Sequence, residues 1–352
     1  MLRLSIIVNM YNTAKYMQKC VDSLLCQDIP AEEYEIIFVD DCSPDNSLEM
    51  ANQYKDEELR TRGKGGSYPQ IKVCHHELNR GLAAGRNTGV DAAEGKYLCF
   101  VDPDDYIEKN SLKALLDQMD AENLDMLRFD YQKVDEAYKN IAHNHAERSL
   151  ILTPKFMTGI DFLATRLGIL CYVWPYIYRT ELIKGDEAKG EKTIRFVEDC
   201  YFDDVPWLPR VLMRAQRVNC NPIKHQYYLQ RQGSMVRTAS MMRKIEGQIR
   251  VIILLQDQMQ NTAGLVQKWY ERMIAFSASS IMGSIAALEK EDAYTVIGQL
   301  EKLQCFPMPL TVYNKKRAVL KQMMMNINPR LYWQLIHKRY KTLLPNLSCH
   351  TR

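Results

Sequence analysis

The sequence lacks any long apolar segment. Its 352 residues contain no uninterrupted hydrophobic run near the roughly 18 residues that a membrane-spanning helix needs. Val251–Leu255 is too short for this, and Ser and Gly break up the run Phe276–Leu288. The first residues, Leu4–Val8, have the pattern of a buried strand and lack the basic and apolar regions of a signal peptide. We therefore expect a cytoplasmic protein.

Paired cysteines are also missing. The 10 cysteines are scattered, none forms a Cys-x-x-Cys motif, and none clusters with histidine at a spacing typical of zinc sites. Most lie in apolar runs, as Cys99 does in Tyr97–Val101, where cysteine behaves as a small hydrophobic residue. This pattern disfavours a zinc domain and a secreted disulfide framework, and it agrees with a reducing compartment.

No glycine follows the first predicted strand, where Asn9-Met10-Tyr11-Asn12 stands instead. A nicotinamide dehydrogenase requires its glycine-rich fingerprint at this position, and Gly81–Gly89 comes too late in the chain to supply it. A sugar nucleotidyltransferase would need a loop rich in Gly and containing Arg at the same place. The sequence disfavours both enzyme classes.

Strands and helices alternate over about the first 130 residues. Apolar runs predict strands at Leu4–Val8, Tyr34–Val39, Ile71–Cys74, Lys96–Val101 and Met126–Phe129, and helical spacing predicts helices at Thr13–Gln27, Leu82–Ala93 and Leu112–Met119. The charged stretch Lys55–Gln70 is expected to be an exposed loop. This order predicts an α/β fold with a mostly parallel, Rossmann-like sheet and helices on both faces.

Acidic, amide and imidazole side chains gather where these predicted strands end. They are Asn9, Asp40-Asp41, His75-His76 and the group Asp102, Asp104 and Asp105. In open α/β sheets, ligands bind outside the carboxyl ends of the strands. We therefore predict an active site at this edge.

Asp102, Asp104 and Asp105 lie within four residues, directly after an apolar strand. Such carboxylates repel one another, and hard oxygen ligands suit Mg²⁺ or Mn²⁺, which also bind phosphate oxygens. An acidic turn or helix cap would explain the same residues. The acids at Asp40-Asp41, which end a neighbouring strand, favour the metal–phosphate interpretation.

Sugar transfer from a nucleoside diphosphate also requires a carboxylate that accepts the proton of the acceptor hydroxyl. Glu198-Asp199 is the best candidate, because its aromatic neighbours would desolvate and position a carboxylate. A pair of acids at a helix start is the alternative, and Asp203-Asp204 nearby weakens the signal.

Several segments, in order, resemble an inverting glycosyltransferase of family 2 with the GT-A fold. They are Ser5–Asn12, Ile36–Ser43, Asn79–Gly89, Phe100–Asp105, Val173–Arg179, Phe196–Asp199 and Tyr227–Ser234. The similarity covers about residues 1–240, which we expect to form the catalytic domain. Ile245, Ile249 and Ile252 recur at helical spacing, so we expect residues 241–352 to form a mainly helical region with a basic tail.

The resemblance assigns roles to individual residues. Base and nucleotide binding falls to Asn9, Tyr11, Asp40 and Asp41, with the base usually uracil and with Arg86 near the base or the diphosphate. Asp102 and Asp104 match an Asp-x-Asp motif. Asp102 is also expected to contact the nucleotide, Asp104 to bind Mn²⁺ or Mg²⁺, and Asp105 to assist.

The remaining roles concern catalysis and closure of the site. Asp199 is expected to be the general base with Glu198 beside it, and Arg231 and Ser234 are expected to close over the diphosphate. Two positions depart from the family pattern, since Asn9 stands where Pro is usual and Pro103 where a small residue is usual.

The resemblance implies transfer of a sugar from a UDP-sugar to a glycan or polyprenyl-linked glycan, in cell-surface polysaccharide synthesis. The Gln-x-x-Arg-Trp motif of processive synthases is absent, which favours single addition. The alternative is a noncatalytic protein that binds a nucleotide-sugar or a glycan. The intact residues Asp102, Asp104 and Asp199 argue against that alternative.

Nine basic residues and no acidic residue follow Leu310, although the whole chain has 46 Lys and Arg and 43 Asp and Glu residues. Basic residues alternate with apolar ones from Asn314 to Lys341, which predicts peripheral contact with an anionic membrane surface; a solvated surface is the alternative. Nucleic acid is not an expected partner, because the preceding residues are mildly acidic and carry no recognised motif.

Other candidates have two interpretations each. We expect His75-His76 to be an exposed pair at a strand end, and His225 to be either a phosphate contact or a core residue. Trp174 and Trp207 would serve as sugar platforms or, more commonly for Trp, lie buried.

Overall fold

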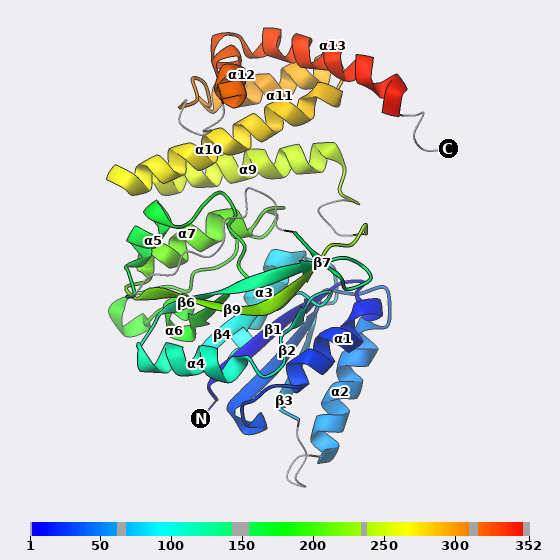
Figure 1. The fold of residues 1–352 in the computed structure, drawn as a ribbon, viewed down its shortest axis with the longest axis vertical. Coiled ribbons are helices and arrows are strands. Elements are labelled where there is room, and N and C mark those ends of the chain that lie inside the picture. The colour runs from blue at the N-terminus through cyan, green and yellow to red at the C-terminus, as the bar shows by residue number, and fades with distance from the viewer. Residues whose placement is uncertain (1, 62–67, 143–154, 234–237, 310–315, 348–352) are drawn as a thin grey trace. The chain divides into compact units, whose positions relative to one another are not determined.

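The computed structural model describes residues 2–61, 68–142, 155–233, 238–309 and 316–347 (Figure 1). The chain divides into two compact units. The first contains Met1–Asp199 and Asp203–Thr238, and the second contains Cys200–Phe202 and Ala239–Arg352. Each unit is described separately below.

One mixed sheet organises the first unit, with the strand order β3-β2-β1-β4-β8-β6-β9-β5. Its parallel part consists of β1 (Leu4–Met10), β2 (Tyr34–Asp40), β3 (Gln70–His75) and β4 (Tyr97–Phe100). The mixed part consists of β5 (Tyr106–Ile107), β6 (Met126–Val134), β7 (Asn140–Ile141), β8 (Tyr176–Arg179) and β9 (Val218–Leu229). The predicted α/β class is confirmed. The parallel arrangement holds for the first four strands, whereas β8 is antiparallel to both β4 and β6.

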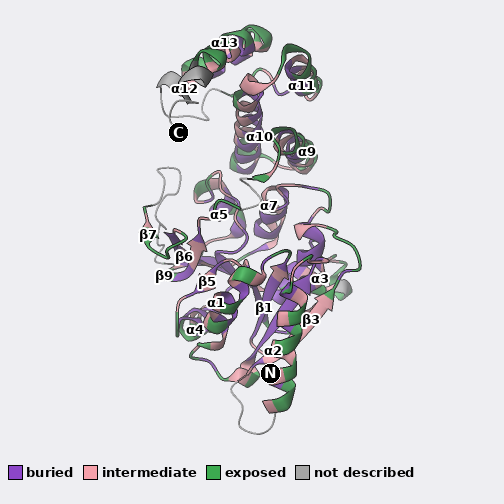
Figure 2. Cartoon of the chain, turned by 90° about the vertical axis from the view of Figure 1, so that its right-hand side faces the viewer, coloured by how far each residue is buried: buried purple, intermediate pink, exposed green. Residues whose placement is uncertain are grey.

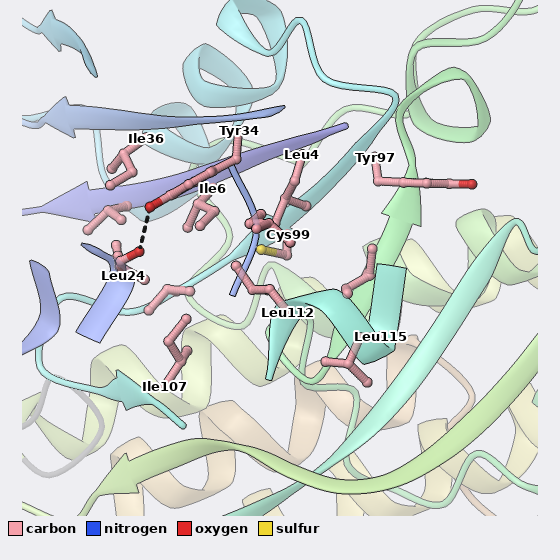
Figure 3. Close-up of a cluster of buried hydrophobic side chains, with 14 of the residues drawn as sticks. Leu4, Ile6, Leu24, Tyr34, Ile36, Tyr97, Cys99, Ile107, Leu112 and Leu115 are labelled. Atoms are coloured by element: carbon pink, nitrogen blue, oxygen red, sulfur yellow. Dashed lines mark hydrogen bonds between the residues drawn. The ribbon is translucent and has the colours of Figure 1, made fainter. Parts of the chain in front are cut away.

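Side chains of β1 alternate between two buried faces, as expected for a strand in the centre of a sheet. On one face Leu4 and Ile6 pack among residues of α1 (Ala14–Leu25) and α4 (Leu112–Ala121), such as Leu24 and Leu112 (Figure 3). The Tyr34 hydroxyl of β2 donates to the Leu24 carbonyl at 3.1 Å, which ties α1 to the sheet.

Helix α3 (Leu82–Ala92) covers the opposite face of β1, and two glycines allow it to approach closely. A Cβ atom at Gly89 would lie 2.3 Å from Ile7 Cγ2, and one at Gly85 would lie 2.8 Å from Asn9 Oδ1. Both distances are too short for a side chain to fit without a shift. The predicted helices on both faces of the sheet are therefore confirmed.

The loop predicted at Lys55–Gln70 is wrong over residues 55–61, and residues 62–67 lie outside the described ranges. Helix α2 (Ser47–Thr61) continues through residues 55–61, where the charged composition predicts an exposed loop. The helix buries Ala51 and Glu58, and it carries the pair Arg60–Glu57 at i,i+3 spacing, so charge here marks the solvated side of a helix. The other helices of this unit are α5 (Gly159–Thr165), α6 (Thr180–Lys184) and α7 (Asp204–Arg214), with short 3₁₀ turns at Ala31–Glu33 and Glu187–Lys189.

The second unit is helical, as predicted. It contains α9 (Met241–Met259), α10 (Gly264–Ser284), a 3₁₀ turn (Ile285–Ala287), α11 (Lys290–Lys302), α12 (Lys316–Ile327) and α13 (Pro329–Leu347). Helix α10 is buried along most of its length (Figure 2). The Trp333 indole of α13 donates to the Ile285 carbonyl at 2.9 Å and anchors α13 to the 3₁₀ turn. Across the described ranges, no helix combines the length and the apolar character needed to cross a membrane.

His225 of β9 is a core residue, and the two tryptophans are buried as well. His225 is 1% exposed, its Nδ1 lies 2.7 Å from the Ser111 hydroxyl, and its ring packs edge-on against Phe129. Burial lowers the pKa of His225 to about 3, because the interior disfavours the charged imidazolium. Trp174 and Trp207 are 4% and 0% exposed. All three residues serve packing in the described structure.

The buried His225 makes stability depend on pH. Its pKa in the folded state lies below its ordinary value, so protonation favours the unfolded chain and the free energy of unfolding falls as pH drops from about 6.5 towards 3. We expect a loss of about 1.4 kcal/mol per pH unit in that window. Urea unfolding of the natural protein and of His225→Asn, followed from pH 7 to 5, checks this. Parallel pH slopes in the two proteins would contradict it.

Candidate active site

Parallel register brings the ends of three strands to one edge of the sheet. Met10 pairs with Asp40, and Ile7 pairs with Phe100, so β1, β2 and β4 end side by side. Backbone pairing continues one residue further, since Asp41 N donates to Met10 O and Val101 N donates to Ile7 O. The polar residues that follow these strands are thereby assembled at this edge.

The Asp41 carboxylate anchors the loop between β3 and α3. It is 5% exposed and accepts hydrogen bonds from the backbone nitrogens of Arg80 at 2.8 Å and Gly81 at 2.7 Å. Gly81 has φ of +89°, a conformation that glycine adopts readily. His76 supplies a third partner at 2.8 Å. A carboxylate has about four acceptor positions, so one remains for a ligand N–H.

The two histidines after Cys74 have different environments. His76 is 7% exposed, with Nδ1 on Asp41 and Nε2 at 2.9 Å from the Thr88 hydroxyl, so the prediction of an exposed pair is wrong for it. Its burial follows from Thr88 on α3 and from Asp41 directly after β2, two partners that local sequence does not reveal. His75 is exposed, and its Nδ1 lies 2.9 Å from Asp40 Oδ2.

Asp40, Asn9 and Tyr11 occupy different depths at this edge. Asp40 is wholly buried, which favours a supporting role for the loop over direct nucleotide contact. Asn9 Oδ1 is buried beside Gly85 and has no hydrogen-bond partner among the described residues. Tyr11 is 51% exposed at the end of β1, where its ring is accessible for stacking.

The acidic segment after β4 has three distinct environments. Burial raises the pKa of Asp102 to about 6, against the lowering effect of Arg86. Asp104 Oδ2 accepts from Arg231 Nε at 2.5 Å, and both side chains are largely buried. Asp105 is 1% exposed and accepts from Leu229 N and Gln226 Nε2, each at 2.8 Å. Asp105 therefore braces the segment against β9, and its burial disfavours the predicted part in metal binding.

Asp102 and Asp104 fit a divalent cation that is shared with a ligand. Mg²⁺ in such sites is held by one or two carboxylates, with water and substrate phosphates completing the shell. Burial, together with the neighbouring Asp104, raises the pKa of Asp102, and a bound cation would favour the ionised carboxylate. Within the residues that the structure describes, no group of three His, Cys, Asp or Glu side chains forms a complete metal site. Protein ligands alone would therefore not suffice.

Arg86 is already paired inside the protein. It is 5% exposed, and its Nη1 donates to both carboxylate oxygens of Asp203 at 2.9 Å. Burial raises the pKa of the adjacent Asp204 to about 7. This pairing favours a role beneath the acidic segment over a direct diphosphate contact. The sequence interpretation treated Asp203-Asp204 only as residues that weaken the signal of Glu198-Asp199, and it missed the pairing of Asp203 with Arg86.

Glu198 and Asp199 lie in a turn that faces solvent. Both are exposed, so the expected desolvation by aromatic neighbours is wrong; Phe196, at 2% exposure, is buried beneath them instead. Asp199 has φ of +60°, a left-handed conformation that is uncommon outside glycine and often found at functional sites. The Arg80 guanidinium donates to Glu198 at 3.0 Å. The loop that Asp41 anchors thus reaches the turn that carries Asp199.

Arg231 lies over the Tyr16 ring, with its guanidinium carbon 4.9 Å from the ring centre. Together with the Asp104 contact, this places Arg231 beside the acidic segment, as expected for a residue near a diphosphate. Ser234, which is predicted to act with it, lies outside the described residues.

Comparisons with known proteins agree with this architecture. The profile described as glycosyl transferase family 2 matches residues 5–180. The uncharacterized glycosyltransferase EpsJ of Bacillus subtilis is 35% identical over 199 residues, which is 56% of this chain and 54% of EpsJ. The poly(ribitol-phosphate) beta-N-acetylglucosaminyltransferase TarS of Staphylococcus aureus is 28% identical over 241 residues, which is 68% of this chain and 38% of TarS. The chain therefore spans about half or less of these relatives.

Two solved structures share the fold. S. aureus TarS 1–349 in complex with UDP-GlcNAc has a TM-score of 0.69 at 21% identity, covering 97% of this chain and 92% of that one. The mannosyltransferase PcManGT of Pyrobaculum calidifontis, in complex with GDP-Man and Mn²⁺, has a TM-score of 0.52 at 13% identity, covering 93% and 87%.

Removal of Arg231 is expected to expose the Asp104 carboxylate to cations. In Arg231→Ala, Mn²⁺ no longer competes with the guanidinium, so its affinity for the nucleotide-free protein should rise by about tenfold, or 1.4 kcal/mol. Calorimetric titration with MnCl₂ measures this, with Arg231→Lys as the charge-preserving control. An unchanged affinity in Arg231→Ala would contradict a metal role for Asp104.

Proposed function

The chain belongs to glycosyl transferase family 2, and we propose that it transfers a sugar from a UDP-sugar to a hydroxyl of a glycan or polyprenyl-linked glycan. One observation carries this proposal. The β3–α3 loop, held by Asp41 at the predicted base-binding edge, also contacts Glu198 through Arg80. A donor bound at that edge and a general base in the 198–199 turn would therefore both contact the same loop.

The donor proposal rests on the strand-end residues. Tyr11 would stack on uracil, and the remaining acceptor position of Asp41 suits its N3–H group. Asn9 would contribute an amide beside the base. The structurally similar TarS binds UDP-GlcNAc, which supports a uridine donor for this chain.

Mn²⁺ or Mg²⁺ would be held by Asp104 and Asp102. When bound, such a cation neutralises the negative charge that develops on the departing diphosphate. The Mn²⁺ complex of PcManGT, which has the same fold, supports a metal. Arg231 would leave Asp104 for the diphosphate, because a guanidinium also pairs well with phosphate oxygens.

Asp199 would act as the general base, with Glu198 beside the acceptor. It would take the proton of the acceptor hydroxyl while that oxygen forms a bond to the anomeric carbon. The bond between this carbon and the diphosphate oxygen breaks, and UDP leaves on the opposite face. This sequence inverts the anomeric configuration. Its exposure leaves the Asp199 carboxylate open to an acceptor hydroxyl.

A lipid-linked acceptor would be met at a membrane surface, and the second unit offers a surface for this. Its last two helices expose large apolar side chains, with Leu320 at 60% and Ile327 at 81% exposure. Lys338 and Arg339 of α13 are exposed as well, and no acidic residue follows Leu310. Apolar and basic side chains together suit an anionic bilayer.

The noncatalytic alternative predicts donor binding without turnover. Calorimetry with UDP, GDP, CDP and dTDP, each with and without Mn²⁺, should give metal-dependent binding of UDP alone. Release of UDP from a panel of UDP-sugars, with water or a polyprenyl-linked glycan as acceptor, then separates the two functions. Binding of UDP with no release from any donor would favour the noncatalytic protein.

Asp199→Asn should abolish transfer and leave the donor site intact. The amide cannot accept the hydroxyl proton, so we expect turnover to fall about 10²- to 10⁴-fold. The dissociation constant for UDP and Mn²⁺ should stay within about twofold, because Asp199 is not expected to touch the donor. Turnover close to that of the natural protein would refute the assignment of the base.

Membrane contact can be tested by flotation with vesicles of phosphatidylglycerol and phosphatidylethanolamine. The natural protein should float with them at low salt, and the double change Lys338→Glu and Arg339→Glu should weaken flotation severalfold. Lys109→Glu, on an exposed residue of the first unit, is the matched control. Equal flotation of all three proteins would contradict the proposal.

A further inference from the structure

We propose that Asn87 is a positioning residue, which holds the Glu198-Asp199 turn in place through the backbone of Phe196. This inference rests on the proposed role of Asp199 as the base. Residues 191–197 belong to no helix or strand, so side chains must fix the segment that leads to Asp199.

The Asn87 side chain pairs with both backbone polar groups of Phe196. Asn87 lies on α3 and is 7% exposed. Its Oδ1 accepts from Phe196 N at 2.8 Å, and its Nδ2 donates to Phe196 O at 3.0 Å. The amide thereby supplies the two bonds that a neighbouring antiparallel strand would supply. Its Nδ2 also lies 3.4 Å from Glu198 Oε1, at the start of the turn.

Phe196 is itself fixed by aromatic packing. Its ring stacks on Trp207 of α7 with centres 4.2 Å apart and an angle of 7°, and it meets Phe100 edge-on at 5.6 Å. The Trp207 indole donates to Ile194 O at 2.9 Å. The segment before the turn is therefore attached to α3, α7 and the end of β4 at once.

Asp199 follows this attachment by three residues. Since each residue spans at most about 3.6 Å, Asp199 lies within about 11 Å of Phe196. The left-handed backbone at Asp199, with φ of +60°, directs the chain through a tight turn at this point. A shift of Phe196 would pass directly to the carboxylate.

The second restraint on the turn is weaker. Arg80 and Glu198 form an ion pair, but their side chains are 51% and 41% exposed, so solvent and salt screen it. The Asn87 contacts are buried, where loss of a partner leaves two backbone groups unpaired. An aspartate at position 87 would provide no donor for Phe196 O and would repel Glu198. The two hydrogen bonds to Phe196 therefore require an amide side chain at position 87.

Asn219 provides a matched control. It is 5% exposed, its Nδ2 donates to Glu122 at 2.7 Å, and its Oδ1 accepts from Cys220 N at 2.8 Å. It thus resembles Asn87 in burial and in having both its amide nitrogen and its amide oxygen bonded to the protein, but it lies on β9 and bonds to Glu122 and Cys220. Asn219→Ala should lower the melting temperature with little effect on turnover.

The test compares Asn87→Ala, Asn87→Asp, Asn219→Ala and Asp199→Asn in the full chain. We expect both Asn87 variants to lower turnover of the best UDP-sugar about 10- to 100-fold, because a displaced base loses proton transfer. The dissociation constant for UDP and Mn²⁺ should stay within about twofold. Hydrogen exchange should accelerate in peptides covering residues 194–199 and stay unchanged in β1 and β2.

The double variant separates positioning from general damage. If Asn87 acts through Asp199, adding Asn87→Ala to Asp199→Asn should cause no further loss of turnover. A further loss, or a parallel loss of UDP affinity, would overturn the inference. Unchanged hydrogen exchange at residues 194–199 in Asn87→Ala would overturn the inference that Asn87 holds Phe196 in place. Full turnover of Asp199→Asn would instead overturn the base on which the proposed function depends.

Discussion

The candidate site depends on one interaction, the grip of the Asp41 carboxylate on the loop between β3 and α3. Two backbone N–H groups and His76 converge on this side chain at 2.7 to 2.8 Å. Hydrogen bonds to an ionised acceptor are stronger than neutral ones, and here they are also buried. They set the start of α3 relative to β2. Arg80 and Asn87, which reach the 198–199 turn, are positioned as a result.

Charge at the acidic end of β4 is balanced from within the protein. Arg86 pairs with Asp203 below this segment, and Arg231 pairs with Asp104 beside it. Burial and the neighbouring Asp104 raise the pKa of Asp102, and the two arginines oppose this shift. The two arginines differ in burial, since Arg86 is enclosed and Arg231 is partly accessible. Of the two, Arg231 is the more accessible for the exchange of Asp104 for a diphosphate that we propose.

The predictable part of the site followed from short-range patterns. Apolar runs located the central strands, and a parallel sheet places their carboxyl ends together, so Asn9, Asp41 and Asp102 were expected at one edge. Errors arose where a residue's surroundings come from distant parts of the chain. His76, for example, is buried by its contacts with Asp41 and Thr88. The part of α2 in residues 55–61 was not predicted, because its few buried residues give a weak helical periodicity.

The sequence by itself determined the α/β order, the family and the residue types at the strand ends, because these depend on local periodicity and on motifs within a few residues. Tertiary structure alone decided which of those residues are free to meet a ligand. Asp40 and Asp105 are enclosed, Tyr11 and Asp199 face solvent, and Asn87 reaches Phe196 across 109 positions of the chain. Burial and hydrogen-bond partners are properties of the packed chain, and no local pattern encodes them.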